Sequence, residues 1–310
     1  MTSAVHSGAQ TVLVVGADGQ LGRALIQALR ETGRPVLGTT RRSDRLDGST
    51  VHLDVADPRS ELRLDGVASA VICAGVTSIA ACARDPLGSA ETNVTGIARL
   101  GEMLSEAGVH TLYLSSDAVF DGRMPRPGID DPTRPTSEYG RQKRRAEILL
   151  SERAEEVGIV RFSKILPPDA SLFRQWAVDL LAGRRIEPFS DARFAPLSLG
   201  FALDVVVRAV AGRVRGVLHA SASRDISYAD AAVRLASRLE VDPALVRPVA
   251  AARSGQPPFP DHTAMDTSTL RLLGLEAPDP FDAIERIELL RASWMPHADP
   301  ISLVEGGAPW

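Results

Sequence analysis

The chain has 310 residues, of which 44% are hydrophobic, and its formal net charge at pH 7 is −4. This length is enough for one large hydrophobic core or two moderate ones. The absence of a basic excess excludes a broad nucleic-acid-binding surface. The two cysteines, Cys73 and Cys82, lack the spacing of a metal site or a disulfide framework. Residues 1–10 lack the apolar segment of a signal peptide, and no apolar run approaches the ~18 residues of a membrane span. We therefore expect a cytoplasmic protein that contacts no membrane.

The first half of the chain alternates short apolar runs with helical patterns. Strands are expected at 11–16, 35–40, 50–55, 69–75, 110–116 and 158–166. Helices are expected at 21–33, within 86–107, and in the segment that contains Tyr139. Continuous apolar strands that alternate with helices are typical of a parallel sheet covered on both faces. The predicted fold class is therefore α/β, with a Rossmann-type doubly wound sheet.

The second half is less regular and predicts a smaller lobe. Helices are expected at 167–185, 201–212, 228–241, 267–273 and 280–293, with a strand at 216–221 and a loop at 251–262. We expect a flexible N-terminus over 1–10, a dinucleotide-binding domain over 11–163 and a loose tail over 296–310. The remaining residues, 164–295, would form an α/β substrate-binding lobe, from which about 198–221 returns to the first domain.

A glycine-rich turn follows the first predicted strand. In the segment GADGQLG, Gly16, Gly19 and Gly22 surround Gln20 and Leu21, and a helix begins at once. Glycine allows a tight turn and a close approach to a pyrophosphate, and a helix N-terminus offers free amides to that anion. The context between a first strand and a first helix predicts dinucleotide binding. The alternative is a plain strand-to-helix turn.

The ends of the next two strands bear on the choice of cofactor. The second strand ends in Arg41 and Arg42, with no acid before Asp44. A carboxylate there would bind a ribose 2′-hydroxyl, whereas arginine suits a 2′-phosphate. We therefore expect a preference for NADP(H), with NAD(H) left open; the alternative is that both arginines are solvated loop charges. Asp54 and Val55 are placed to border the adenine, unless Asp54 only caps a helix.

Three polar residues suggest proton-transfer chemistry. Tyr139 and Lys143 are four residues apart, which puts both on one face of a helix. A nearby cation favours the phenolate and lowers the pKa of a tyrosine, so the pair can exchange a proton with an alcohol or carbonyl oxygen. Ser116 ends the fifth strand, where carboxyl ends face the ligand in open α/β sheets. It can therefore donate a hydrogen bond to the same oxygen.

These motifs together resemble a known family. GADGQLG after a strand, CAG at the fourth strand, SSDAVFDG and PTSEYGRQK resemble the extended short-chain dehydrogenase/reductases, and within them the dTDP-4-dehydrorhamnose reductase branch. The resemblance is strong over 11–163 and implies hydride transfer to a 4-keto carbon of a nucleotide-linked deoxysugar. It implies that Tyr139 protonates the oxygen, that Ser116 orients the carbonyl, and that Lys143 lowers the tyrosine pKa and holds the nicotinamide ribose. It also places Ala74 and Gly75 beside the cofactor, and Asn93 on the following helix.

The same resemblance assigns Asp117, Val119 and Phe120 to the substrate site, and one departure adds a fourth residue. Lys164 lies near the carboxyl end of the expected sixth strand, where the branch usually has an aromatic that contacts the sugar. A cation at a strand's carboxyl end could bind a phosphate or carboxylate of the substrate, or it could be a salt-bridged lysine of a lid. The later run HTAMDTSTLRLLGL resembles the closing element of the family, which supports a substrate lobe of the same kind.

Two other functions stay open at this point. One is a sugar-nucleotide epimerase or dehydratase with tightly bound NAD, although dehydratases usually carry an acid pair where this chain has Asp117 alone. The other is a non-catalytic regulatory subunit that binds a dinucleotide and a partner protein. The expected partner is a small-molecule substrate, without nucleic acid, membrane or metal. A homodimer is left open.

Overall fold

The computed structural model describes residues 10–153, 156–251 and 259–288. The expected tail over 296–310 and nearly all of the expected flexible N-terminus lie outside these ranges. Within them, the central feature is a parallel seven-stranded sheet in the order β10-β6-β5-β4-β1-β2-β3. Its strands are β1 (Thr11–Val15), β2 (Val36–Thr40), β3 (Thr50–His52), β4 (Val67–Ile72), β5 (His110–Ser116), β6 (Val157–Phe162) and β10 (Gly216–Ala220). The predicted Rossmann-type α/β fold is confirmed.

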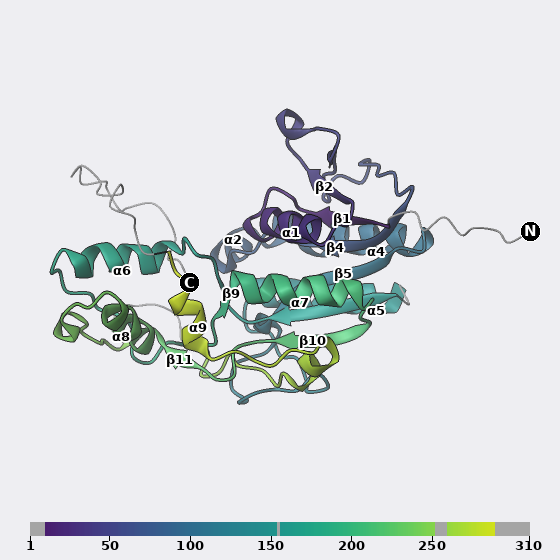
Figure 1. The fold of residues 1–310 in the computed structure, drawn as a ribbon. Helices are drawn as coiled ribbons and strands as arrows, with labels where there is room; N and C mark the ends of the chain where they lie inside the picture. The colour runs from purple at the N-terminus through teal and green to yellow at the C-terminus, as the bar shows by residue number, and fades with distance from the viewer. Residues whose placement is uncertain (1–9, 154–155, 252–258, 289–310) are drawn as a thin grey trace, which may run out of the picture.

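Helices cover both faces of this sheet (Figure 1). On one face α1 (Gln20–Glu31) packs against α7 (Leu199–Ala211), and Leu25 and Val205 belong to the hydrophobic core beneath them. On the other face α4 (Ile97–Glu106) packs against α5 (Glu138–Arg153), and Leu100 and Leu150 belong to a second core. The strand order reverses between β1 and β4, which is where such sheets bind ligands at their carboxyl ends.

A third hydrophobic core lies beyond the carboxyl edge of β6. It is formed by α6 (Ser171–Leu181), α8 (Tyr228–Arg238) and α9 (Pro280–Glu285). Two short sheets join it: β8 (Arg193–Phe194) pairs antiparallel with β11 (Ile226–Ser227), and β7 (Ile165–Leu166) pairs parallel with β9 (Leu197–Ser198). The rings of Phe194 and Tyr228 stack with centroids 4.2 Å apart. Between these elements the chain returns to the large sheet through α7 and β10, because β10 pairs with β6.

Several predicted boundaries needed correction. The helix expected over 280–293 ends at Glu285 as α9, and residues 289–293 lie outside the described ranges. The single strand expected over 158–166 is two strands, because β6 ends at Phe162 and β7 pairs with β9 in a different sheet. The helical stretch expected over 86–107 is divided into α3 (Pro86–Ala90), a π-helix (Glu91–Gly96) and α4, and a short helix α2 (Ile79–Arg84) precedes them. π-Helical turns are rare and frequently mark functional sites. No helix in the described ranges is long and apolar enough to cross a membrane.

Candidate active site

The glycine turn between β1 and α1 has no room for side chains. Gly16 has a φ of +93°, and a Cβ there would lie 2.8 Å from the backbone nitrogen of Ala74. A Cβ on Gly22 would lie 2.2 Å from the carbonyl oxygen of Gly16. Gly19 precedes α1 in extended conformation and forms no side-chain cap, so side chains leave the first amides of the helix open. The turn therefore fits an anion such as a pyrophosphate.

The end of β2 is tied to this turn by hydrogen bonds. The Gly16 amide donates to Thr39 Oγ1 at 3.1 Å. The Asp18 carboxylate accepts from the hydroxyl of Thr40 and from Arg45, which is 3.0 Å away. Asp18 lies inside the glycine motif, yet sequence reasoning did not assign it a role. Its charged partner is 27 positions away and follows no recognisable spacing.

The two arginines predicted to select the cofactor lie just beyond β2. Arg42 pairs with Asp44 at 3.1 Å in an exposed ion pair, and Arg41 is exposed. Asp54 Oδ1 accepts a hydrogen bond from the Ala56 amide at 3.0 Å, so this carboxylate caps a turn after β3. The adjacent Val55 is buried. Arg41 and Arg42 follow the carboxyl end of β2, and Asp54 and Val55 follow that of its parallel neighbour β3. They therefore lie at the edge of the sheet that was predicted from the sequence.

Two more predicted residues of the cofactor site, Gln20 and Leu21, begin α1. The Gln20 side chain donates to Asp169 Oδ1 at 2.8 Å, which links the glycine turn to the segment before α6. Leu21 packs against the hydrophobic core under α1.

The three predicted catalytic residues come from β5 and α5. Ser116 ends β5 and donates from Oγ to Asp117 Oδ1 at 2.8 Å. Lys143 is buried, and its Nζ donates to the carbonyl oxygen of Leu114 at 2.8 Å. The same Nζ lies 5.9 Å from the centroid of the Tyr139 ring. Burial raises the pKa of the Tyr139 phenol, and the Ser116 hydroxyl lies close enough to oppose this rise.

One glycine allows this approach. A Cβ on Gly140 would lie only 2.0 Å from the carbonyl oxygen of Ala118, in the 3₁₀ turn Asp117–Val119 that follows Ser116. The first turn of α5 therefore rests directly on the backbone after β5. Gly140, the residue after Tyr139, therefore allows Tyr139 to lie near Ser116.

The electrostatics correct one expectation. The pKa of Tyr139 was expected to be lowered by Lys143, but burial raises it above the ordinary value of 10, and the nearby Asp117 carboxylate adds to this rise. Burial also lowers the pKa of Lys143 to about 8. The Lys143 ammonium is directed to the Leu114 carbonyl, so it does not compensate for the desolvation of the phenol. Tyr139 therefore keeps its proton at neutral pH, the form in which it can donate.

Asp117 and Lys164 influence each other at the ends of β5 and β6. Burial raises the pKa of the Asp117 carboxyl to about 6, the Ser116 hydroxyl opposes this, and so does the Lys164 ammonium. Lys164 is an exposed residue, and desolvation of its ammonium lowers its pKa while Asp117 raises it. Both side chains therefore lie near the end of β5 that carries Ser116.

Val119 and Phe120 have surroundings that sequence reasoning did not anticipate. Val119 is fully buried. The Phe120 ring packs edge-on against the His219 ring, with centroids 5.7 Å apart. The guanidinium carbon of Arg161 lies over the face of the Phe120 ring, 5.2 Å from its centroid. Phe120 also lines a cavity of about 270 Å³ together with Asp121, Arg123 and Met124. Contact of Val119 and Phe120 with a substrate stays a prediction.

A buried ion pair under the site was also missed. Glu147 is fully buried on α5 and accepts from Arg161 of β6 at 3.0 and 2.8 Å. It accepts from the Ser115 hydroxyl at 2.6 Å as well. One signal was available, because Arg161 interrupts the apolar run of a central strand. Among the described residues no group of three His, Cys, Asp or Glu side chains could hold a metal ion.

Fold and site together define a class. A glycine turn, a serine, a tyrosine and a lysine lie along one edge of a doubly wound sheet, as in the extended short-chain dehydrogenase/reductases, which are NAD(P)-dependent oxidoreductases. The chain belongs to the RmlD substrate-binding domain family, whose model matches residues 10–287. This confirms the resemblance stated from the sequence.

Named relatives agree with this assignment. The chain is 29% identical over 273 residues to a probable dTDP-4,6-dihydroxy-2-methyloxan-3-one 4-ketoreductase of Streptomyces antibioticus, covering 85% of this chain and 89% of that protein. It is 26% identical over 276 residues to a dTDP-4-dehydrorhamnose reductase of Mycobacterium tuberculosis, covering 86% and 88%. The fold is similar to that of dTDP-4-dehydrorhamnose reductase from Bacillus anthracis in complex with NADP, with a TM-score of 0.76 at 20% identity, covering 90% and 99% of the two chains.

Proposed function

We propose that this chain reduces the 4-keto group of a dTDP-linked deoxysugar with NADP(H). The observation that carries the proposal is the meeting of Ser116, Tyr139 and Lys143 at the sheet edge that also holds the glycine turn. Membership of the RmlD family and the names of two relatives, a 4-ketoreductase and a dTDP-4-dehydrorhamnose reductase, support the same substrate class.

The residues would divide the chemistry as follows. A bound nicotinamide cofactor supplies a hydride to the carbonyl carbon. Tyr139, which keeps its proton at neutral pH, would protonate the carbonyl oxygen. Ser116 would donate a hydrogen bond that orients that oxygen. Lys143 would hold the nicotinamide ribose, with its ammonium donating to the Leu114 carbonyl oxygen.

The decisive experiment follows NADPH oxidation against a panel of dTDP-linked keto sugars. The wild-type enzyme is expected to oxidise NADPH with at least one 4-keto sugar, and Tyr139→Phe is expected to lose at least about a hundredfold in kcat, as general acid catalysis commonly contributes that much. Activity that survives Tyr139→Phe would refute the proposed proton donor. Tightly bound NAD in the purified protein would instead favour an epimerase, and no turnover of any ketone would favour a binding subunit.

The cofactor preference is proposed to reside in Arg41 and Arg42. The turn between β1 and α1 would bind the pyrophosphate, with Gly16, Gly19, Gln20, Leu21 and Gly22 around it. Asp54, Val55, Ala74 and Gly75 would border the rest of the dinucleotide. A lower KM for NADPH than for NADH is expected, and Arg41→Ala combined with Arg42→Ala should remove the difference. Equal values in the wild type would contradict the preference.

Lys164 is proposed to bind an anionic group of the substrate. Its ammonium lies near Asp117 at the end of β5, which is the edge where the carbonyl would be held. Lys164→Met should raise the KM for the sugar nucleotide and leave the KM for NADPH unchanged. Arg30→Met, an exposed change at the far end of α1, is the matched control. An unchanged KM in Lys164→Met would remove this residue from the site.

The division of the chain is part of the proposal. Residues 11–163 would bind the dinucleotide, and 164–295 would bind the substrate, apart from about 198–221, where α7 and β10 lie on the large sheet. The cytoplasmic location and a homodimer stay predictions.

A further inference from the structure

We infer that Gln142 is a positioning residue that fixes the cofactor-binding segment after β4 relative to Tyr139 and Lys143. It lies between these two residues in sequence but makes its contacts in another direction. Its side chain is 3% exposed, and every polar atom of its amide is hydrogen-bonded. The inference rests on the proposed function, because it concerns how that site is held together.

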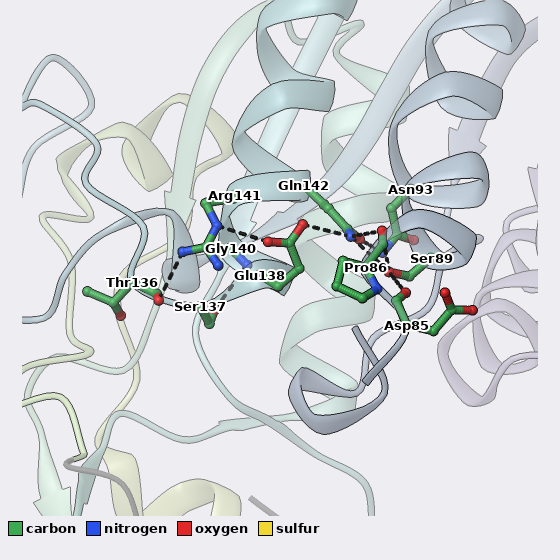
Figure 2. Close-up of polar contacts among 10 residues, drawn as sticks. All are labelled: Asp85, Pro86, Ser89, Asn93, Thr136, Ser137, Glu138, Gly140, Arg141 and Gln142. Carbon is green, nitrogen blue, oxygen red and sulfur yellow. Dashed lines mark hydrogen bonds and ion pairs between the residues drawn. The ribbon is translucent and has the colours of Figure 1, made fainter. Parts of the chain in front are cut away.

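The donor side of the Gln142 amide is bonded to α3 and to its own helix. Nε2 donates to the Ser89 hydroxyl at 2.8 Å, to the carbonyl oxygen of Pro86 at 3.0 Å and to Glu138 at 3.1 Å (Figure 2). Ser89 in turn donates to the carbonyl oxygen of Asp85 at 2.7 Å. The N-terminal part of α5 is thereby attached to a helix about fifty residues earlier in the chain.

The acceptor side reaches the segment that follows β4. Gln142 Oε1 accepts from Asn93 Nδ2 at 2.8 Å, as Figure 2 shows. Asn93 is 1% exposed and lies in the π-helix. It binds both backbone groups of Val76, since Oδ1 accepts from the amide at 2.7 Å and Nδ2 donates to the carbonyl at 2.9 Å. The side chain of Asn93 therefore connects Gln142 to the backbone of Val76, the residue after Gly75.

The geometry of Gly75 shows how tightly this contact is made. Gly75 has a φ of +157°, and a Cβ on it would lie 3.0 Å from Asn93 Oδ1. A movement of Asn93 is therefore transmitted to the Gly75–Val76 backbone. Gly75 is one of the residues proposed to border the dinucleotide. Without the Gln142 amide, Asn93 loses the partner that connects it to α5. Fully satisfied buried networks of this kind fix one arrangement of the elements that they join.

The network contacts no reacting group directly, so its effect should be on alignment. In Gln142→Leu the apolar side chain fills a similar space but leaves the Ser89 and Pro86 groups and one Asn93 proton without this partner. We expect the dissociation constant for NADPH, measured by the fluorescence of the bound cofactor, to rise about tenfold, the size expected from one or two lost buried hydrogen bonds. kcat should fall, and the primary isotope effect with deuterated NADPH should increase because hydride transfer becomes slower.

A double-mutant cycle tests the connection through Asn93. If the two amides act as one link, Gln142→Leu combined with Asn93→Ala should bind NADPH no more than about twofold more weakly than the poorer single variant. Arg141→Gln is the matched control, because this exposed neighbour bonds only Glu138 and the carbonyl oxygen of Thr136 among the described residues. It should behave as the wild type. Urea unfolding of every variant separates loss of fold from loss of alignment.

Either of two results would overturn the inference. In the first, Gln142→Leu binds NADPH as tightly as Arg141→Gln and shows the same isotope effect. In the second, the losses of NADPH affinity in Gln142→Leu and Asn93→Ala multiply when the two changes are combined. Ser89→Ala gives a milder test should Gln142→Leu fail to fold, and a weaker NADPH affinity than in Arg141→Gln is expected there too. The binding measurement needs no sugar substrate. If the wild type reduces no ketone, the proposed function fails while the role of Gln142 is still decided.

Discussion

The contact between Gly140 and Ala118 gives a sharp prediction for Gly140→Ala. The added Cβ would lie 2.0 Å from the Ala118 carbonyl oxygen, and real Cβ atoms essentially never come closer than 3.0 Å to such an atom. The start of α5 and the turn after Ser116 must therefore separate by at least 3.0 − 2.0 = 1.0 Å. Both atoms that set this distance are backbone or Cβ atoms, so no side chain can rotate away.

Stability and activity should respond very differently to this displacement. Overpacking of this kind costs about 1–3 kcal/mol, and the gain in helix propensity from glycine to alanine returns up to about 1 kcal/mol. The free energy of unfolding should therefore fall by no more than about 3 kcal/mol. A displacement of about 1 Å between Tyr139 and Ser116 should lower kcat on the order of a hundredfold.

The assay combines urea unfolding with steady-state NADPH oxidation. Gly200→Ala is the first control, since this glycine of α7 has no atom within 4 Å of its added Cβ, and it should be slightly stabilised with unchanged kcat. Gly101→Ala is the second, because its added Cβ meets only the end of the Leu150 side chain at 2.2 Å, which can move. A Gly140→Ala enzyme that is folded and within about threefold of the wild-type kcat would refute the reasoning, because a 1 Å displacement should cost far more.

Three further outcomes are expected. Arg161→Met leaves the buried Glu147 without its main partner and should lower the free energy of unfolding by about 3–5 kcal/mol, most of which Glu147→Met should restore in the double variant; a loss in urea unfolding near zero would contradict this. The pKa of Asp117 is about 6 in the folded protein and has the usual value of 3.8 in the unfolded chain. Ionisation of Asp117 therefore lowers the free energy of unfolding progressively as the pH rises between these two values, by at most about 3 kcal/mol above pH 6. Asp117→Asn removes this loss, so it should stabilise the protein only above about pH 4. A stability difference independent of pH would count against that assignment. Gly22→Ala, whose Cβ would lie 2.2 Å from the Gly16 carbonyl oxygen, should abolish NADPH binding in fluorescence titrations while the sheet still folds, as judged by circular dichroism; binding at the wild-type level would show that the turn can open.

The sheet could be predicted well from the sequence because a parallel sheet produces a recognisable pattern within short segments of the chain. Strands buried on both faces must be apolar along most of their length, and β1, β4 and β5 are each followed by helices. The glycine turn and the Tyr139–Lys143 spacing are local patterns as well. The prediction of a single strand over 158–166 failed, because the local sequence does not reveal that Ile165 and Leu166 pair with Leu197 and Ser198 in another sheet.

The network behind the site could not be predicted in the same way. Gln142 and Glu147 occur in a highly charged stretch that is typical of a solvated helix. Their burial follows from partners far away in sequence, such as Asn93 at a separation of 49 and Arg161 at 14. Nor could the rise in the Tyr139 pKa be anticipated, because it depends on how deeply the phenol is buried and not on the distance to Lys143 in sequence.

The use of lysine in this chain makes the site chemically addressable. Lys143 and Lys164 are the only lysines among 310 residues, and every other basic side chain, histidine aside, is arginine. Desolvation lowers the pKa of both ammonium groups, to about 8 for Lys143. A larger share of Lys143 is therefore an uncharged amine near neutral pH than in an ordinary exposed lysine. Reagents that acylate amines would thus have two side-chain targets. Mass spectrometry of the modified peptides would show separately whether bound cofactor protects Lys143 and whether bound substrate protects Lys164.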